Sequence, residues 1–277
     1  MTDPALTRLD KSEVLAGLFA CWDGLDKLLG GLTDQQWSQP VPLPGWSVHD
    51  VVAHLVGTES MLLGTPTPQS DLDVSALEHV RNEIGANNEC WVRHLRGESP
   101  ADLLGRFRSV TQQRRAVLAG LSDDDWSAPT ATPVGPDSYG RFMRVRIFDC
   151  WMHELDIRDG VGLPASDAEL AGPAAALALD EMSAAMGRVV GKLGGAPQGS
   201  RVALELTGPL ARTIRVTVDG RGRVVDDFGG EAPTAVIRMD GLAFTRVAGG
   251  RAAPDGVELD GDRDVATRIV QHLNYVI

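Results

Sequence analysis

The spacing of apolar residues changes once along this 277-residue chain, and that change constrains the fold more than any other feature. Up to about residue 193, apolar side chains recur every three or four positions, which is the period of a helix with one buried face. From residue 201 they alternate with polar residues and many are β-branched, as in half-buried strands. We therefore predict an α+β protein with a helical domain over residues 1–163 and a smaller α+β domain over residues 164–277.

Polar caps, prolines and glycines mark the ends of the predicted elements. Ser47 is a good N-cap for the second helix, and Pro100 begins a later one. The predicted helices cover residues 11–29, 48–64, 75–95, 100–120, 141–160 and 167–193. The predicted strands, which we expect to form a small antiparallel sheet, cover residues 201–206, 213–218, 223–228 and 235–239. A short helix from Leu242 and a last helix over residues 262–273 complete the prediction.

A nine-residue phrase occurs twice in the helical part. Leu32-Thr33-Asp34-x-x-Trp37-Ser38-x-Pro40 returns as Leu121-Ser122-Asp123-x-x-Trp126-Ser127-x-Pro129. Each copy follows a long helix and precedes, after a loop, another one. The phrase is a common way to begin a helix, and it is also what an up-down bundle built from two related helix pairs would contain.

Charge and hydropathy exclude two classes of partner. The chain has 38 acidic and 26 basic side chains, hence a net charge of −12, so we expect no nucleic-acid partner. No apolar run reaches the roughly 18 residues of a membrane-spanning helix, so we expect no membrane partner. The polar residues 1–13 lack the apolar core of a secretory signal, and we therefore expect a cytoplasmic protein.

The three cysteines do not suggest a disulfide framework or a redox motif. Cys21, Cys90 and Cys150 form no C-x-x-C pair, and their number is odd. We interpret all three as small buried hydrophobic side chains.

Histidine and carboxylate side chains share a helical face in two places. Asp149 and His153 are four residues apart, with Asp156 one turn further on, and Asp50 and His54 repeat the spacing on an earlier helix. Facing helices with such side chains build metal sites in bundle cores, and two imidazoles with one carboxylate leave coordination positions open. The same spacing also occurs in exposed ion pairs and in capped core histidines.

Other catalytic motifs are missing from the sequence. His153 and Glu154 do not begin an H-E-x-x-H motif, because Ile157 stands where the second histidine should be. There is no G-x-S-x-G, P-loop or G-x-G-x-x-G pattern. The remaining histidines, which are His49, His79, His94 and His272, have no partner at ligand spacing.

The stretch from Leu43 to Leu55, LPGWSVHDVVAHL, resembles the PGW-T/S-V-x-D-L-V-A-H-L signature of the mycothiol-dependent maleylpyruvate isomerase family, in the DinB-like superfamily. The phrase FTRVAGGR, Phe244 to Arg251, followed by Gly261-Asp262, is similar to the second domain of that family. The resemblance implies an up-down four-helix bundle that holds a divalent metal, with zinc the first candidate. The arginine-rich, lysine-poor composition fits an actinobacterial source, where mycothiol is the usual thiol.

The resemblance also implies the metal ligands. The last histidine of the first signature is His54, and the family's E-x-x-x-H helix, followed by an aspartate, maps to Asp149, His153 and Asp156. Asp149 is one methylene shorter than the family's glutamate, so its helix must lie closer to the metal or bind through a different oxygen. We expect Asp50 and Asp156 to orient the two histidines, although both would look the same as surface charges.

The function implied is that of a mycothiol-dependent metalloenzyme, which would isomerise a small electrophilic substrate or transfer sulfur to it. Arg251 is the candidate for a catalytic or thiol-binding role, as a guanidinium that binds a carboxylate at a cleft between the domains. A solvated loop arginine would show the same sequence. The alternative function is that of a non-catalytic, metal- or small-molecule-binding member of the superfamily.

Overall fold

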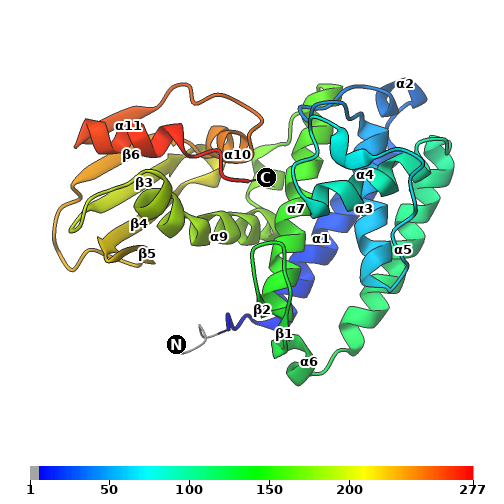
Figure 1. Ribbon diagram of the computed structural model, residues 1–277, viewed down its shortest axis with the longest axis horizontal. Coiled ribbons are helices and arrows are strands. Elements are labelled where there is room, and N and C mark those ends of the chain that lie inside the picture. The colour runs from blue at the N-terminus through cyan, green and yellow to red at the C-terminus, as the bar shows by residue number, and fades with distance from the viewer. Residues whose placement is uncertain (1–5, 277) are drawn as a thin grey trace. The chain divides into compact units, whose positions relative to one another are not determined.

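The computed structural model describes residues 6–276, and the chain divides into two compact units, Met1–Ala165 and Ser166–Ile277 (Figure 1). The first, which we call the bundle unit, contains four long helices: α1 (Lys11–Gly30), α3 (Val48–Leu62), α5 (Pro100–Gly120) and α7 (Tyr139–Val161). Helices α1 and α3 each pack against both α5 and α7, so the four close a ring around an apolar core. The predicted α+β class and DinB-like bundle are confirmed. None of the described helices is long and apolar enough to cross a membrane.

The repeated phrase folds in the same way both times. It forms the one-turn helices α2 (Asp34–Trp37) and α6 (Asp123–Ser127), each begun by a capping box and each burying its tryptophan. After each helix comes a proline that pairs with the serine capping a long helix: Pro40 with Ser47 before α3, and Pro129 with Ser138 before α7. In the second copy the pairing extends to two short strands, β1 (Pro129–Thr130) and β2 (Asp137–Ser138). The repeat therefore fixes where both of these long helices begin.

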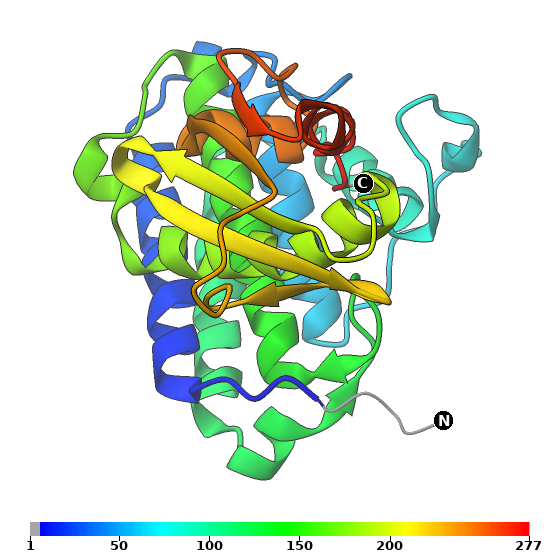
Figure 2. The same ribbon diagram turned by 90° about the vertical axis from the view of Figure 1, so that its left-hand side faces the viewer.

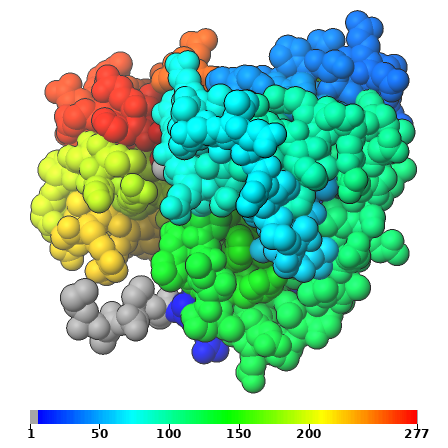
Figure 3. Space-filling view, turned by 45° about the vertical axis from the view of Figure 1, so that its right-hand side comes forward, coloured from blue at the N-terminus to red at the C-terminus, as the bar shows by residue number. Residues whose placement is uncertain are grey.

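The predicted helix over residues 75–95 is wrong in its first half. The structure has a short 3₁₀ turn, η1 (Val74–Ala76), and α4 (Glu83–Leu95) begins only after Asn82, whose side chain caps it. The ring of His79 contacts the buried carboxylate of Glu89, Nε2 to Oε2 at 3.2 Å. This tertiary contact holds the segment out of the helix. The segment between α3 and α4 lies on the surface of the bundle unit, among the cyan atoms of Figure 3.

The second unit, which we call the sheet unit, contains five strands in the order β5-β4-β3-β6-β7 (Figure 2). They are β3 (Arg201–Thr207), β4 (Arg212–Asp219), β5 (Arg221–Val225), β6 (Ala235–Asp240) and β7 (Glu258–Gly261). The 3₁₀ turn η3 (Gly208–Leu210) joins β3 to β4. Helix α9 (Pro173–Arg188) packs against β4 and β5, α10 (Gly241–Ala248) against β3 and β6, and α11 (Arg263–Gln271) against β6 and β7. The core between them is apolar and includes Leu204, Val216 and Ile237.

The sheet is mixed, whereas the sequence predicted an antiparallel one. Strands β3 and β6 run parallel, and the other three pairings are antiparallel. Strand β6 joins the open edge of β3 and not that of β5, and it runs in the same direction as β3. The edge strand β7 was missed because its four residues, Glu-Leu-Asp-Gly, have the composition of a turn.

The predicted helix over residues 167–193 is three elements. A single turn, α8 (Asp167–Leu170), ends before Gly172, and Pro173 begins α9. Proline has no N–H to continue a helix but fits its first turn, so the break falls there. Helix α9 then widens into a π-helical turn, η2 (Val189–Leu193).

Candidate metal centre

Helix α3 places His54 in the interior of the bundle. Ser47 and Asp50 form the capping box that begins the helix, and Gly45 in the preceding turn has a φ of 80°, which favours glycine. One turn after His54, a Cβ on Gly57 would lie 2.4 Å from Cγ of Trp91, so only glycine lets α3 and α4 approach this closely. His54 itself is 4% exposed.

Helix α7 brings the other two candidate ligands to His54. Asp149 and His153 lie on one face, as their spacing predicts, with Nε2 of His153 at 3.5 Å from Oδ1 of Asp149. The other carboxylate oxygen, Oδ2, lies 3.2 Å from Nε2 of His54. The two imidazole rings meet edge to face with their centroids 4.9 Å apart. The shorter aspartate therefore reaches both histidines, because α3 packs directly against α7.

This arrangement fits a divalent metal. Two atoms bound to one tetrahedral zinc at about 2.0–2.2 Å lie about 3.3 Å apart. Oδ2 of Asp149 lies 3.2 Å from Nε2 of His54, and Oδ1 lies 3.5 Å from Nε2 of His153, so each oxygen is near this spacing from one histidine. One ligand atom from each of the three residues lies within 4.8 Å of the others. Two imidazole nitrogens and one carboxylate also form the donor set of open, catalytic zinc sites.

Buried charges prepare the candidate ligands. Burial alone would raise the pKa of Asp149, but Arg146, His54 and His153 hold it well below its usual range. Burial lowers the pKa of His54. Burial also opposes a charge on His153, yet Asp149 and Asp156 raise the pKa of its imidazole to about 9. The carboxylate of Asp149 is therefore ionised at neutral pH. The imidazole of His153 is protonated there, so a metal that binds His153 must displace this proton.

The two carboxylates expected to orient the histidines have different roles. Oδ2 of Asp156 lies 3.0 Å from Nδ1 of His153, so it holds this ring with Nε2 toward the site. The expectation for Asp50 is wrong. Its carboxylate accepts hydrogen bonds from Ser47 and from Nε of Arg96 at 2.9 Å, because it lies in the first turn of α3 and closes the capping box.

Trp46 forms one wall of the site. The centroid of its ring lies 5.6 Å from that of His54 and 6.3 Å from that of His153. Its Nε1 donates to Oε2 of Glu89 at 3.3 Å, and Glu89 also contacts His79 and Arg93. The tryptophan of the signature is thus tied by its polar end to α4 while its ring covers the two histidines.

The remaining histidines, the three cysteines and Arg251 are not among the candidate ligands. Among the described residues, the histidines His49, His79, His94 and His272 belong to no cluster of metal-ligand type. Cys21 and Cys150 are buried as expected, whereas Cys90 is half-buried. Arg251 lies just after α10, where Nη1 donates to the carbonyl of Gly249 at 2.5 Å. Its role at a cleft between the domains stays a prediction.

The sequence pattern did not reveal three buried charged residues around the site. Glu59 on α3, Arg114 on α5 and Arg146 on α7 are 1%, 0% and 4% exposed. The available signal was a charged residue on the apolar face of each helix, where a solvated side chain is not expected. Which of these charges meet one another depends on the packing of three helices and cannot be read from spacing.

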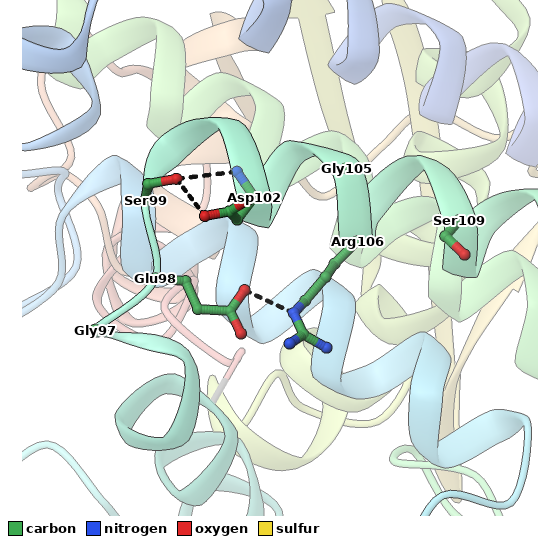
Figure 4. Close-up of a pocket in the computed structure, with 7 residues that line it drawn as sticks. All are labelled: Gly97, Glu98, Ser99, Asp102, Gly105, Arg106 and Ser109. Atoms are coloured by element: carbon green, nitrogen blue, oxygen red, sulfur yellow. Dashed lines mark hydrogen bonds and ion pairs between the residues drawn. The ribbon is translucent and has the colours of Figure 1, made fainter.

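A surface hollow of the bundle unit lies elsewhere in the chain and has no ligand-type cluster (Figure 4). Its lining is Gly97, Glu98, Ser99, Asp102, Gly105, Arg106 and Ser109, at the end of α4 and along α5. Glu98 pairs with Nε of Arg106 at 2.6 Å, and Ser99 caps α5 through Asp102. Its charged groups are satisfied by one another, so the chemistry is carried by the buried site.

Fold and site together define a DinB-like helical-bundle protein with a two-histidine, one-carboxylate site that could bind a metal. Residues 18–158 match the mycothiol maleylpyruvate isomerase N-terminal domain, and residues 176–268 match the C-terminal domain of the same family. The chain belongs to the mycothiol maleylpyruvate isomerase family.

Two curated proteins and a solved structure are similar to the chain. Uncharacterized proteins from two strains of Mycobacterium tuberculosis are each 27% identical to the chain over 157 residues, which is 56% of the chain and 58% of the relative. The match thus spans less than two thirds of the length of these relatives. The crystal structure of the mycothiol-dependent maleylpyruvate isomerase superposes with a TM-score of 0.60 at 17% identity, over 91% of this chain and 93% of that one. This likeness concerns the fold alone.

Proposed function

We propose that this protein is a cytoplasmic, mycothiol-dependent metalloenzyme that isomerises a small electrophilic substrate or transfers sulfur to it. The observation that carries the proposal is the cluster of the buried His54 and His153 with the half-buried Asp149, in a chain of this family. Three protein ligands leave room in the coordination sphere for a small molecule.

The sulfur nucleophile has to come from outside the chain. Cys90 is half-buried but lies outside the ligand cluster. Cys21 and Cys150 are buried, and contact with Cys150 together with burial raises the pKa of Cys21 well above its usual value. A buried thiol of raised pKa is a poor nucleophile, because only the thiolate reacts. An external thiol such as mycothiol is therefore the natural reactant.

Each residue of the site has a defined task in this proposal. His54, Asp149 and His153 would hold the metal, with zinc as the first candidate, and the metal would lower the pKa of a bound thiol. Asp156 keeps Nε2 of His153 directed at the site, and Trp46 shields the two imidazoles. Arg251 would bind a carboxylate of the substrate or of the thiol.

The reaction follows from the chemistry of a thiolate. Its sulfur forms a bond to one carbon of an activated double bond, and the π electrons move onto the neighbouring carbonyl oxygen. The remaining carbon–carbon single bond can rotate. When the electrons return and expel the thiolate, the double bond has changed from cis to trans, and when a different group leaves instead, the product is a thioether.

Cobalt substitution tests this proposal. We expect mycothiol to produce sulfur-to-metal charge-transfer absorption in the Co²⁺ protein, and glutathione to do so only weakly, because the two thiols differ in everything around the sulfur. Arg251→Ala should weaken mycothiol binding or turnover and leave the metal content unchanged. If neither thiol alters the spectrum but a thiol-free ligand does, the protein is instead a non-catalytic binding member of the family.

A further inference from the structure

A buried chain of charges leads from the candidate metal site into the bundle. Oε1 of Glu59 accepts from Nε and Nη2 of Arg146 at 3.0 and 2.9 Å, and Oε2 of Glu59 accepts from Nε of Arg114 at 2.9 Å. Nη1 of Arg146 then reaches forward to Oδ2 of Asp149. These four residues come from α3, α5 and α7, so the chain ties three of the four bundle helices to one candidate ligand.

Arg146 holds one of the two oxygens of Asp149. Oδ2 takes the hydrogen bond from Arg146 and also lies 3.2 Å from Nε2 of His54, while Oδ1 faces Nε2 of His153. Arg146 is itself fixed on its other edge by two hydrogen bonds to Oε1 of Glu59, so its guanidinium cannot swing away without leaving that buried oxygen without a partner. The carboxylate of Asp149 is therefore held in one orientation before any metal arrives.

We propose that Arg146 is a positioning residue for the metal site: its hydrogen bond to Oδ2 fixes the carboxylate of Asp149, so that Oδ1, on the His153 side, is the oxygen offered to a divalent cation. The inference rests on the metal site of the proposed function. In this arrangement Asp149 would bind the metal through one oxygen only, and more of the coordination sphere would stay open for a thiol.

The positive charge of Arg146 also repels a cation, so two effects oppose each other. The structure decides between them by charge balance, since the guanidinia of Arg114 and Arg146 are matched by the carboxylates of Glu59 and Asp149. The two carboxylates thus largely offset the repulsion between Arg146 and a cation. The fixed orientation of Asp149 is then the larger of the two effects. Partners of this kind behind metal ligands typically contribute 10- to 100-fold in metal affinity.

Full-length variants with a matched control test the inference. Arg146→Met removes the hydrogen bond to Asp149, and Arg114→Met removes an equally buried arginine that contacts Glu59 but is not bonded to Asp149. The readouts are the Co²⁺ dissociation constant, from competition with a chelator, and the visible absorption of bound Co²⁺. Arg146→Lys serves as a second variant, because it keeps the buried charge but cannot bridge both carboxylates.

We expect Arg146→Met and Arg146→Lys to weaken Co²⁺ binding about 10- to 100-fold. We also expect the absorption of the remaining Co²⁺ to fall in intensity, as Asp149 turns to bind with both oxygens and the coordination number rises. Arg114→Met should leave the constant and the spectrum unchanged even where it lowers the melting temperature. Unchanged or tighter binding in both Arg146 variants, or the same change in Arg114→Met, would overturn the inference alone. A wild-type protein that binds no Co²⁺ would overturn the proposed function with it.

Discussion

The two units of this protein bury different kinds of side chain. Among the described residues, the bundle unit buries Asp50, His54, Glu59, Glu89, Arg114, Asp137, Arg144, Arg146, His153, Asp156 and Arg158. Over the same described residues, the sheet unit buries one charged side chain, Glu181, and the polar Ser200 and Thr245 in a mainly apolar interior. Buried charges are costly unless each is paired, and they seldom add net stability compared with well-packed apolar side chains. Their concentration in one unit fits the proposed function, which puts metal binding in the bundle unit, whereas the interior of the sheet unit is packed mainly with apolar side chains.

The largest effect should follow from removing a histidine of the candidate site. His54→Ala and His153→Ala each delete one of two imidazole ligands, so we expect the metal content of the purified protein to fall from one per chain to background. Elemental analysis measures it. His94→Ala is the matched control, since His94 contacts the ring of Trp91 and lies outside the cluster. Full metal occupancy in His153→Ala would show that the site is assigned to the wrong residues.

The buried ion cluster should be the next most sensitive feature. Glu59→Ala leaves the guanidinia of Arg114 and Arg146 without their shared carboxylate, and we expect a loss of about 3–5 kcal/mol in the stability of the bundle unit. Hydrogen exchange resolved to peptides of each unit measures this separately.

A charge of the same kind in the sheet unit provides the control for Glu59. Glu205 pairs with Nη2 of Arg238 at 2.6 Å, but both side chains are more than a third exposed. Solvent screens such a pair, so Glu205→Ala should cost about 1 kcal/mol or less. Equal losses in the two variants would contradict the contrast between the units.

The metal-free protein should become less stable as the pH rises. The pKa of His153 is about 9 in the folded protein against 6.5 for an unperturbed imidazole, so its proton stabilises the fold fully below pH 6.5. That contribution, about 3 kcal/mol from the size of the shift, is lost as the pH rises through 9. Urea denaturation of chelated protein between pH 7 and 9.5 measures it. His153→Gln is the control, and parallel pH profiles for the two proteins would refute the explanation.

How much of this could be read from the sequence depends on the range of each interaction. Asp149 and His153 were predictable because a helix places residues i and i+4 on one face. That His54 meets them is a contact across 95 residues, which spacing cannot supply and the family signature did. The pairing of Glu59 with Arg146 is equally long-range and had no signature.

The errors in the fold have the same cause. Residues 77–82 have a helical pattern, but the contact of His79 with Glu89 holds them out of the helix. The parallel pairing of β3 with β6 depends on which free edge of the sheet β6 joins after β5 has paired. In both cases a tertiary contact decided what the local pattern left open.

The smallest expected effect lies in the apolar core of the sheet unit. Ile237 on β6 is fully buried, and Ile237→Val removes one methylene from a packed interior, so we expect a loss of about 0.5–1.5 kcal/mol confined to that unit. The metal content should not change, because the deleted group contributes packing and no charge. Cys150→Ala removes a side chain at another fully buried position, on α7, where Sγ lies 3.5 Å from Nη2 of Arg146. If packing alone mattered at both places, the two variants would behave alike. We expect Cys150→Ala to weaken Co²⁺ binding as well, because it removes a contact of the guanidinium that holds Asp149. Metal affinity measured in both variants therefore separates an interior that supports chemistry from one that supports only the fold, and a loss of affinity in Ile237→Val would remove that distinction.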